Sequence, residues 1–173
     1  MRLITILITI LITTLALMLN LSAPTLASPN KLPVPEITSE GAILIDITTG
    51  QTLFAKNPDK QLEPASTTKI MTALIALEKG NLADMVTAGP SMLNPKLIQG
   101  TRIYLEPGEQ MTLSDLLYAL LLNSANDAAV AIAEHISGDV QAFADLMNAK
   151  AKEIGALNTT FKNPSGLSEE GHV

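Results

Sequence analysis

A serine and a lysine stand three residues apart at the start of a strongly apolar helical pattern, in the segment PASTTKIMTALIALE of residues 64–78. Residues at this spacing share one helix face, so the Ser66 hydroxyl and the Lys69 amine are predicted to lie close together. A serine hydroxyl becomes a nucleophile when a base takes its proton, and a helix N-terminus favours negative charge that develops beside it. The pair has the residue types for acyl transfer through a serine ester.

Lys69 can serve as that base only if its amine is partly neutral near pH 7. Its pKa must then fall by roughly 3 units from about 10.4, which corresponds to about 4 kcal/mol. We expect burial against Ile70, Met71 and Ala73, together with a second nearby cation, to lower it. In the alternative, Ser66 only caps the helix and Lys69 is solvated. The helix alone favours that alternative, because caps outnumber nucleophiles.

A second polar cluster interrupts two apolar helical patterns in LLNSANDAAVAIAEH, residues 121–135. A short loop there could present the Ser124 hydroxyl as a proton relay and the Asn126 amide as a ligand for a substrate carbonyl and for the lysine. The alternative is an ordinary turn with Asn126 as a helix cap. Spacing alone carries little weight, because Ser28 and Lys31 show the same spacing within a proline-rich stretch.

The elements that must position these residues follow from periodicity and turn signals. Paired β-branched runs around Thr48, Thr49 and Gly50 predict a hairpin, and Thr112 with Asp115 predicts a capping box. The predicted strands span 42–47 and 51–55, with further short strands around 102–105, and the predicted helices span 66–79, 112–123, 127–137 and 140–154. The tail from residue 156 to 173 is expected to be rich in turns.

The first 27 residues have the pattern of a secretory signal peptide. Arg2 precedes an apolar run from Leu3 to Leu19, and small residues follow up to Ala27. An uncleaved membrane anchor is the alternative. Residues 28–38 are expected to form an extended leader, and residues 39–173 one folded unit.

The composition narrows the class of protein. A hydrophobic fraction of 47% excludes a disordered chain, and the net charge of −6 argues against nucleic-acid binding. There is no cysteine, which excludes disulfides and thiolate metal sites. Only two histidines occur, and no ligand-spaced carboxylates accompany them, so we expect neither a metal nor a cofactor. His135 is expected on the exposed side of its helix.

Ser-x-x-Lys followed by a Ser-x-Asn triplet resembles the signature of the penicillin-binding proteins and class A β-lactamases. The chain is most similar to the serine D-alanyl-D-alanine carboxypeptidases among the low-molecular-weight penicillin-binding proteins. The resemblance runs from about Glu36 to His172, through GAILIDITTGQTLFAKNPDKQLEPASTTKIMTALIALE, LEPGEQMTLSDLLYALLLNSANDAAVAIAEHISG, MNAKAKEIGALNTTFKNPSGL and the closing GH.

This resemblance implies a site and a reaction. Ser66 would be the acylated nucleophile, Lys69 its general base, Ser124 the proton relay, and Asn126 the residue that holds the substrate amide and steadies Lys69. The enzyme would remove the terminal D-alanine of peptidoglycan stem peptides ending in D-Ala-D-Ala, and β-lactam inhibitors would acylate Ser66. It would act after export, in the periplasm or on the outer face of the cytoplasmic membrane, with membrane contact only through an uncleaved signal segment.

The implied fold is of the mixed α/β class, α+β in type. It resembles the β-lactamase/transpeptidase fold, with a five-stranded antiparallel sheet flanked by helices and a mainly helical lobe. The hairpin at 42–55 would supply the first two strands, and the helices between 112 and 154 the lobe.

Two features depart from the family pattern. Ala125 occupies the position where these carboxypeptidases commonly carry glycine and the lactamases aspartate. No Lys-Thr-Gly triplet is present in the sequence. We therefore expect the chain to be the front portion of the catalytic domain, without the later strands, with an open sheet edge, and inactive as it stands because an oxyanion donor is missing.

Two alternatives remain. A β-lactamase would need a carboxylate that activates water, and Glu169 or Glu170 could be assigned that role, although the pattern NPSGL followed by GH favours loop residues. A noncatalytic protein that binds peptidoglycan or a partner is the other.

Overall fold

The computed structural model describes residue 34 and residues 36–173. The chain divides into two units, residues 1–40 and 41–173. The predicted signal peptide and most of the predicted leader lie outside the described residues, and residues 36–38 have no regular secondary structure. Among the helices that the structure describes, none combines the length and apolar character required to cross a membrane. The fold is therefore described for the second unit.

The second unit begins with the predicted hairpin. Strand β1 (Ala42–Ile45) pairs antiparallel with β2 (Thr52–Lys56). The turn is held by the Asp46 carboxylate, which accepts hydrogen bonds from the backbone amides of Thr48 and Thr49 at 2.9 and 2.8 Å. Within the described residues these two strands pair only with each other, and the apolar side chains of β1 are largely exposed. Within the described part of the chain, the hairpin therefore has an open edge.

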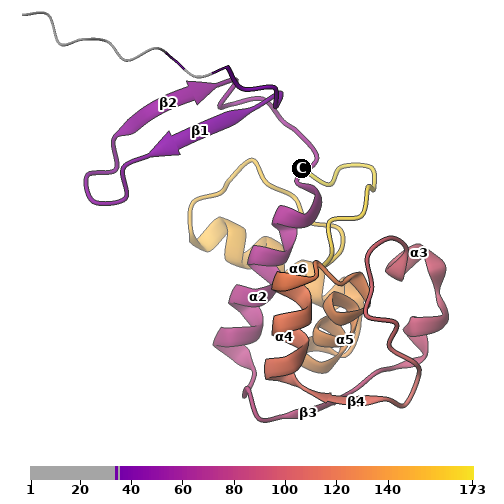
Figure 1. The fold of residues 1–173 in the computed structure, drawn as a ribbon. Helices are drawn as coiled ribbons and strands as arrows, with labels where there is room; N and C mark the ends of the chain where they lie inside the picture. Colours follow the sequence, from indigo (N-terminus) through magenta and orange to yellow (C-terminus); the bar gives the residue numbers. More distant parts are fainter. Residues whose placement is uncertain (1–33, 35) are drawn as a thin grey trace, which may run out of the picture. The chain divides into compact units, whose positions relative to one another are not determined.

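Four helices form the core of the second unit, and α5 is the central one (Figure 1). Helix α5 (Asn126–Ser137) contacts α2 (Thr68–Lys79), α4 (Leu113–Leu122) and α6 (Val140–Glu153). Residues 126–133 of α5 are all buried, and four of these eight are alanines, which allow the neighbouring helices to approach closely. The predicted helices of this region are confirmed within one or two residues at each end.

The helix caps also follow the sequence. The Thr112 hydroxyl accepts a hydrogen bond from the Asp115 amide at 3.0 Å, and the Asp139 carboxylate accepts one from the Ala142 amide at 2.7 Å. Gly138 ends α5 with a φ of 88°, a conformation that favours glycine. These local signals explain why the helix boundaries were predictable.

The segment between α2 and α4 differs from the prediction. It contains β3 (Met85–Thr87), which pairs with β4 (Gln110–Thr112), a 3-10 turn at Pro90–Leu93 and the short helix α3 (Pro95–Ile98). The strands predicted around 102–105 are wrong, because this stretch has no strand pairing. Its backbone is bound instead by the buried Asp127 carboxylate, which accepts hydrogen bonds from the amides of Ile103 and Leu105 at 3.2 and 3.0 Å.

Asp127 offers a test of this arrangement. Its carboxylate is fully buried and also accepts a hydrogen bond from the Ala128 amide at 3.0 Å. Substitution Asp127→Asn places an NH2 group against one backbone donor and leaves that donor unsatisfied. We expect the free energy of unfolding to fall by about 1–3 kcal/mol in urea denaturation. The exposed Asp145→Asn is the matched control, with a change below about 0.5 kcal/mol. Equal effects of the two substitutions would contradict the assignment.

Candidate active site

Ser66 lies where the chain turns into α2. Residues Ala65–Thr67 form a 3-10 turn that runs directly into the helix, and the Ser66 side chain is exposed. It does not cap the helix, because the N-cap of α2 is Thr67 and neither Thr67 nor Pro64, the N-cap of the turn, makes a side-chain capping bond. The alternative that Ser66 serves only as a cap is therefore wrong.

Lys69 is buried, with 3% of its surface exposed. Its Nζ atom donates a hydrogen bond to the Ser165 carbonyl oxygen at 2.7 Å and a longer one to Ser66 Oγ at 3.4 Å. Burial lowers the pKa of Lys69 to about 8, because the charged form loses its hydration. The alternative of a solvated surface lysine is therefore wrong.

The residues that contact the Lys69 amine differ from those expected from the sequence. Ile70 was expected to help bury the amine, but its side chain is 67% exposed. The contact comes instead from Ser165, which lies far along the chain in the segment NPSGL at residues 163–167. Desolvation is the cause of the lowered pKa, and among residues 34 and 36–173 no second cation contributes to it.

Ser124 occupies the bend between α4 and α5. Its backbone adopts a φ of +57°, an unusual conformation for a residue with a side chain. The Ser124 hydroxyl donates a hydrogen bond to Ser66 Oγ at 3.0 Å. The bend therefore brings a second hydroxyl to the predicted nucleophile, 58 positions away in the sequence.

Asn126 is the first residue of α5, and the N-cap is Ala125, so the alternative of an Asn126 cap is wrong. Its side-chain Nδ2 donates to the Gln99 carbonyl at 2.5 Å, and its backbone amide donates to the Thr101 carbonyl at 2.8 Å. Within the described part of the chain, no hydrogen bond joins it to Lys69. Asn126 therefore fixes the segment after α3 beside the bend, and the expected contact with the lysine is not observed.

Ser66, Lys69 and Ser124 line one pocket of about 330 Å3. The other lining residues are Thr67, Ile70, Leu120 and Leu121, which makes one wall apolar. A hydroxyl beside a partly neutral amine and a second hydroxyl can be deprotonated and can attack a carbonyl carbon. The pocket therefore has the chemistry for acyl transfer.

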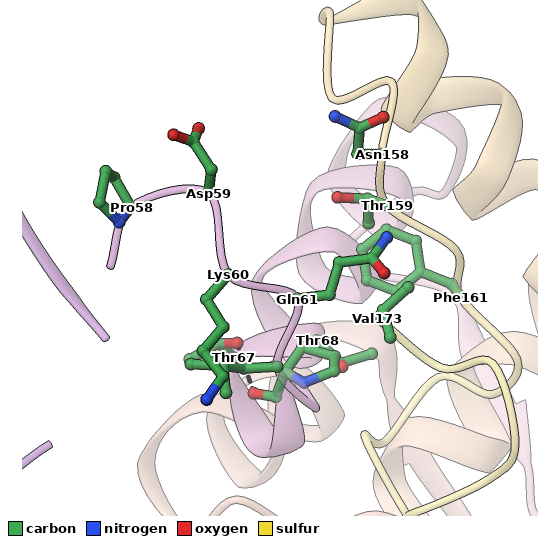
Figure 2. Close-up of a pocket in the computed structure, with 12 residues that line it drawn as sticks. Pro58, Asp59, Lys60, Gln61, Thr67, Thr68, Asn158, Thr159, Phe161 and Val173 are labelled. Carbon is green, nitrogen blue, oxygen red and sulfur yellow. Dashed lines mark hydrogen bonds between the residues drawn. The ribbon is translucent and has the colours of Figure 1, made fainter. Parts of the chain in front are cut away.

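A second pocket, of about 450 Å3, lies elsewhere at the start of α2 (Figure 2). It is lined by residues 58–62, by Pro64, Thr67 and Thr68, and by parts of the tail that include Phe161 and Val173. None of the four residues predicted from the sequence lines it. We assign the candidate active site to the smaller pocket, because the groups with chemistry gather there.

Sequence reasoning missed Ser165, because the atom that contacts Lys69 is a backbone carbonyl oxygen, which every residue type carries. A weak signal was available in Gly166, which follows it. Gly166 has a φ of +85°, and a side chain there would overlap the carbonyl oxygen of Ala65. A glycine that permits such close contact marks a segment pressed against its neighbour.

The carboxylates and histidines considered in the sequence analysis do not line this pocket. Glu169 and Glu170 are exposed loop residues, and the Glu169 carboxylate lies 3.3 Å from the Asn163 side-chain amide. Across residues 34 and 36–173, no group of three or more His, Asp or Glu side chains is placed to hold a metal ion. His135 is exposed on α5, as predicted.

Comparisons with known proteins identify relatives of the chain in sequence and in structure. D-alanyl-D-alanine carboxypeptidase DacF of Bacillus subtilis is 47% identical over 139 residues, which are 78% of this chain and 35% of that protein. The D-alanyl-D-alanine endopeptidase of Pseudomonas aeruginosa is 34% identical over 91% of this chain and 53% of its own length. The crystal structure of penicillin-binding protein 5 from Haemophilus influenzae superposes with a TM-score of 0.74 at 37% identity, over 82% of this chain and 42% of that one.

These comparisons confirm the predicted fold class, the β-lactamase/transpeptidase-like arrangement of the penicillin-binding proteins. The chain spans about a third to a half of the length of the curated relatives that it matches. The sequence profile of peptidase family S11, described as D-alanyl-D-alanine carboxypeptidase, matches residues 27–173. The chain belongs to the S11 family of D-alanyl-D-alanine carboxypeptidases.

Proposed function

We propose that this protein is a serine D-Ala-D-Ala carboxypeptidase that removes the terminal D-alanine of peptidoglycan stem peptides. One observation supports this most directly: Ser66 Oγ lies 3.4 Å from Lys69 Nζ and 3.0 Å from Ser124 Oγ. The names of the relatives supply the substrate class. β-Lactams, which mimic the D-Ala-D-Ala end, would acylate Ser66. The protein would act after export, in the periplasm or on the outer face of the cytoplasmic membrane.

In the first half of the reaction, neutral Lys69 takes the hydroxyl proton of Ser66. The Ser66 oxygen attacks the carbonyl carbon of the penultimate D-alanine. The N-terminal end of α2, which lies beside Ser66, favours the negative charge that develops on the carbonyl oxygen. The C–N bond then breaks. The leaving amine receives a proton through Ser124, which is hydrogen-bonded to the Ser66 oxygen, and free D-alanine departs.

In the second half, water hydrolyses the ester on Ser66. Lys69, neutral again after its proton has left with D-alanine, takes a proton from the attacking water. The ester C–O bond breaks, and the proton returns to the Ser66 oxygen. The shortened peptide leaves as a carboxylic acid, and the site returns to its starting state.

Asn126 is proposed to bind the substrate amide. A carboxamide has two N–H donors and an acceptor oxygen, and the Gln99 carbonyl occupies one of the donors. Asn126 is buried and does not line the pocket of Ser66 and Ser124, so this role requires its remaining donor or its oxygen to turn toward a peptide bond beside Ser124.

Labelling with a fluorescent penicillin tests the proposal. We expect the intact chain to gain one covalent adduct at Ser66, detected by intact mass and peptide mapping, and Ser66→Ala to gain none. The assay uses excess reagent and long incubation, so that slow acylation is also detected. Ser114→Ala, which alters a serine outside the pocket, is the control and should label like the unmodified chain.

Three outcomes separate the alternatives. A stable adduct at Ser66 supports the carboxypeptidase assignment. Rapid release of the label with hydrolysis of the drug would instead indicate a β-lactamase. A folded protein that never labels would contradict catalysis and favour a noncatalytic peptidoglycan-binding protein.

The pKa of Lys69 predicts how labelling depends on pH. Because burial lowers this pKa to about 8, about a tenth of the amine is neutral at pH 7 and about half at pH 8. The labelling rate should therefore rise with pH and level off above about 8. Lys69→Gln should abolish this rise and lower the rate at pH 8 by roughly 100-fold or more.

The exposed Lys152→Gln is the matched control and should retain the full pH profile. A rate that is flat between pH 6 and 9 in the unmodified chain would exclude Lys69 as the base.

A further inference from the structure

His172 is almost completely buried, with 2% of its surface exposed, yet it takes no part in the acyl-transfer scheme. Both of its ring nitrogens have partners. Nε2 lies 3.1 Å from Thr68 Oγ1, and Nδ1 lies 3.3 Å from the side-chain Nδ2 of Asn163. The ring also meets Phe161 edge to face, with centroids 5.9 Å apart. A polar side chain buried with this many partners has a defined orientation.

The side chain of Asn163 links His172 to the backbone of the NPSGL segment. Asn163 Oδ1 accepts hydrogen bonds from the backbone amides of Ser165, Gly166 and Leu167 at 3.3, 2.9 and 3.1 Å. Its Nδ2 is therefore the donor, and the acceptors around it are the Leu167 carbonyl at 2.9 Å, the Glu169 carboxylate at 3.3 Å and His172 Nδ1 at 3.3 Å. The Leu167 backbone is also a hydrogen-bond partner of the ring, so in neutral His172 one ring nitrogen donates and the other accepts within this network.

These contacts tie the NPSGL segment to the start of α2. Asn163 organises the turn whose carbonyl, at Ser165, accepts the hydrogen bond from Lys69 Nζ. Thr72 adds a second link through its hydroxyl, which donates to the Pro164 carbonyl at 2.7 Å. His172 is the residue that connects the turn at Asn163 to Thr68, the immediate neighbour of Lys69.

We propose that His172 is a positioning residue that holds the NPSGL segment over Lys69, through its hydrogen bonds to Asn163 and Thr68. It touches neither the nucleophile nor the base and acts through the segment. The inference deepens the proposed function, because it assumes that Lys69 is the base. Without the ring, the Ser165 carbonyl is less firmly held and water reaches the amine of Lys69.

Protonation of His172 should weaken the same arrangement. A protonated ring donates from both nitrogens and places a positive charge where only 2% of the residue is exposed. Burial lowers the pKa of His172, while the nearby Glu169 and Glu63 carboxylates and a hydrogen bond with the Leu167 backbone oppose that shift and Lys162 adds to it. The neutral ring is therefore the form that the fold binds, and its contribution to stability is present above the unfolded pKa of about 6.5 and is lost as the pH falls below it.

The surroundings of the ring suggest which variant is cleanest. Figure 2 shows Thr68 and Phe161, which both contact His172, at the wall of the 450 Å3 pocket. A His172 variant that leaves a cavity beside these residues would admit water, and the effect of that water on the Lys69 pKa could not be separated from the loss of the hydrogen bonds. His172→Phe keeps an aromatic ring against Phe161 and removes both hydrogen bonds. His172→Gln can keep a polar partner for Thr68, so it is the conservative variant for rescue.

The experiment measures the pKa of Lys69 in the intact chain by carbon-13 NMR of labelled lysine side chains, with Lys69→Gln for assignment. In the unmodified chain we expect about 8. In His172→Phe we expect a higher pKa, toward the value of about 10.4 for a hydrated lysine. Labelling of Ser66 at pH 7.5 should then fall roughly 10-fold to 100-fold, and its rise should move to higher pH. His172→Gln should show a smaller shift.

The matched control is His135→Gln, which alters the exposed histidine of α5 and should change neither quantity. A folded His172→Phe with a lowered melting temperature but an unchanged Lys69 pKa would overturn the proposal, since that pattern indicates packing alone. If His172→Phe does not fold, Thr68→Val, which removes the partner of Nε2 at nearly constant volume, decides by the same readout.

The two proposals fail in different ways. If the unmodified chain does not label while the Lys69 pKa still depends on His172, the proposed function fails and the positioning role stands. If the chain labels normally and the pKa is indifferent to His172 and Thr68, only the positioning role fails.

Discussion

The candidate site depends on one constraint, which is that a lysine amine must be kept out of water while a backbone carbonyl still binds it. Lys69 meets this condition through burial and a 2.7 Å hydrogen bond to the Ser165 carbonyl. Burial alone would favour the neutral amine and would leave its protons without acceptors. The carbonyl satisfies a proton without adding a full negative charge, so the pKa remains lowered, at about 8. A carboxylate in the same place would raise the pKa and remove the base.

The bend at Ser124 shows how the rest of the unit supports this constraint. A positive φ at a serine has a conformational cost of order 1–3 kcal/mol and persists only where the surroundings hold it. Here the backbone amide of Ala125 donates to the Ala119 carbonyl at 3.2 Å, and that of Asn126 to the Thr101 carbonyl at 2.8 Å. The central helix α5 begins at this point, so its burial anchors the bend. Core packing thus positions a hydroxyl at the surface pocket.

The sequence predicted the parts of this structure that local chemistry determines. Thr112 and Asp139 mark helix starts because their side chains bind backbone amides three residues later, and such bonds leave a pattern in the residue types. The strands expected at 102–105 are absent because the buried Asp127 binds that backbone from another element. The role of the Ser165 carbonyl could not be predicted from the sequence for a similar reason, because it depends on a tertiary contact with Lys69. Local pattern therefore gave the helices and the serine–lysine pair, and long-range contacts determined the rest.

Two burial effects in the site act in the same direction. Burial lowers the pKa of Lys69 and also that of His172, so the fold favours the neutral form of each group. Lys69 must be neutral to accept the Ser66 proton, and the neutral ring of His172 is the form that its buried surroundings favour. Both conditions are lost as the pH falls, and neither is lost as it rises. Under the proposed mechanism, the acid limb of the pH profile then combines the titration of the base with the release of the segment that shields it. Under this proposal, burial is the largest contribution to the lower pH limit of the site.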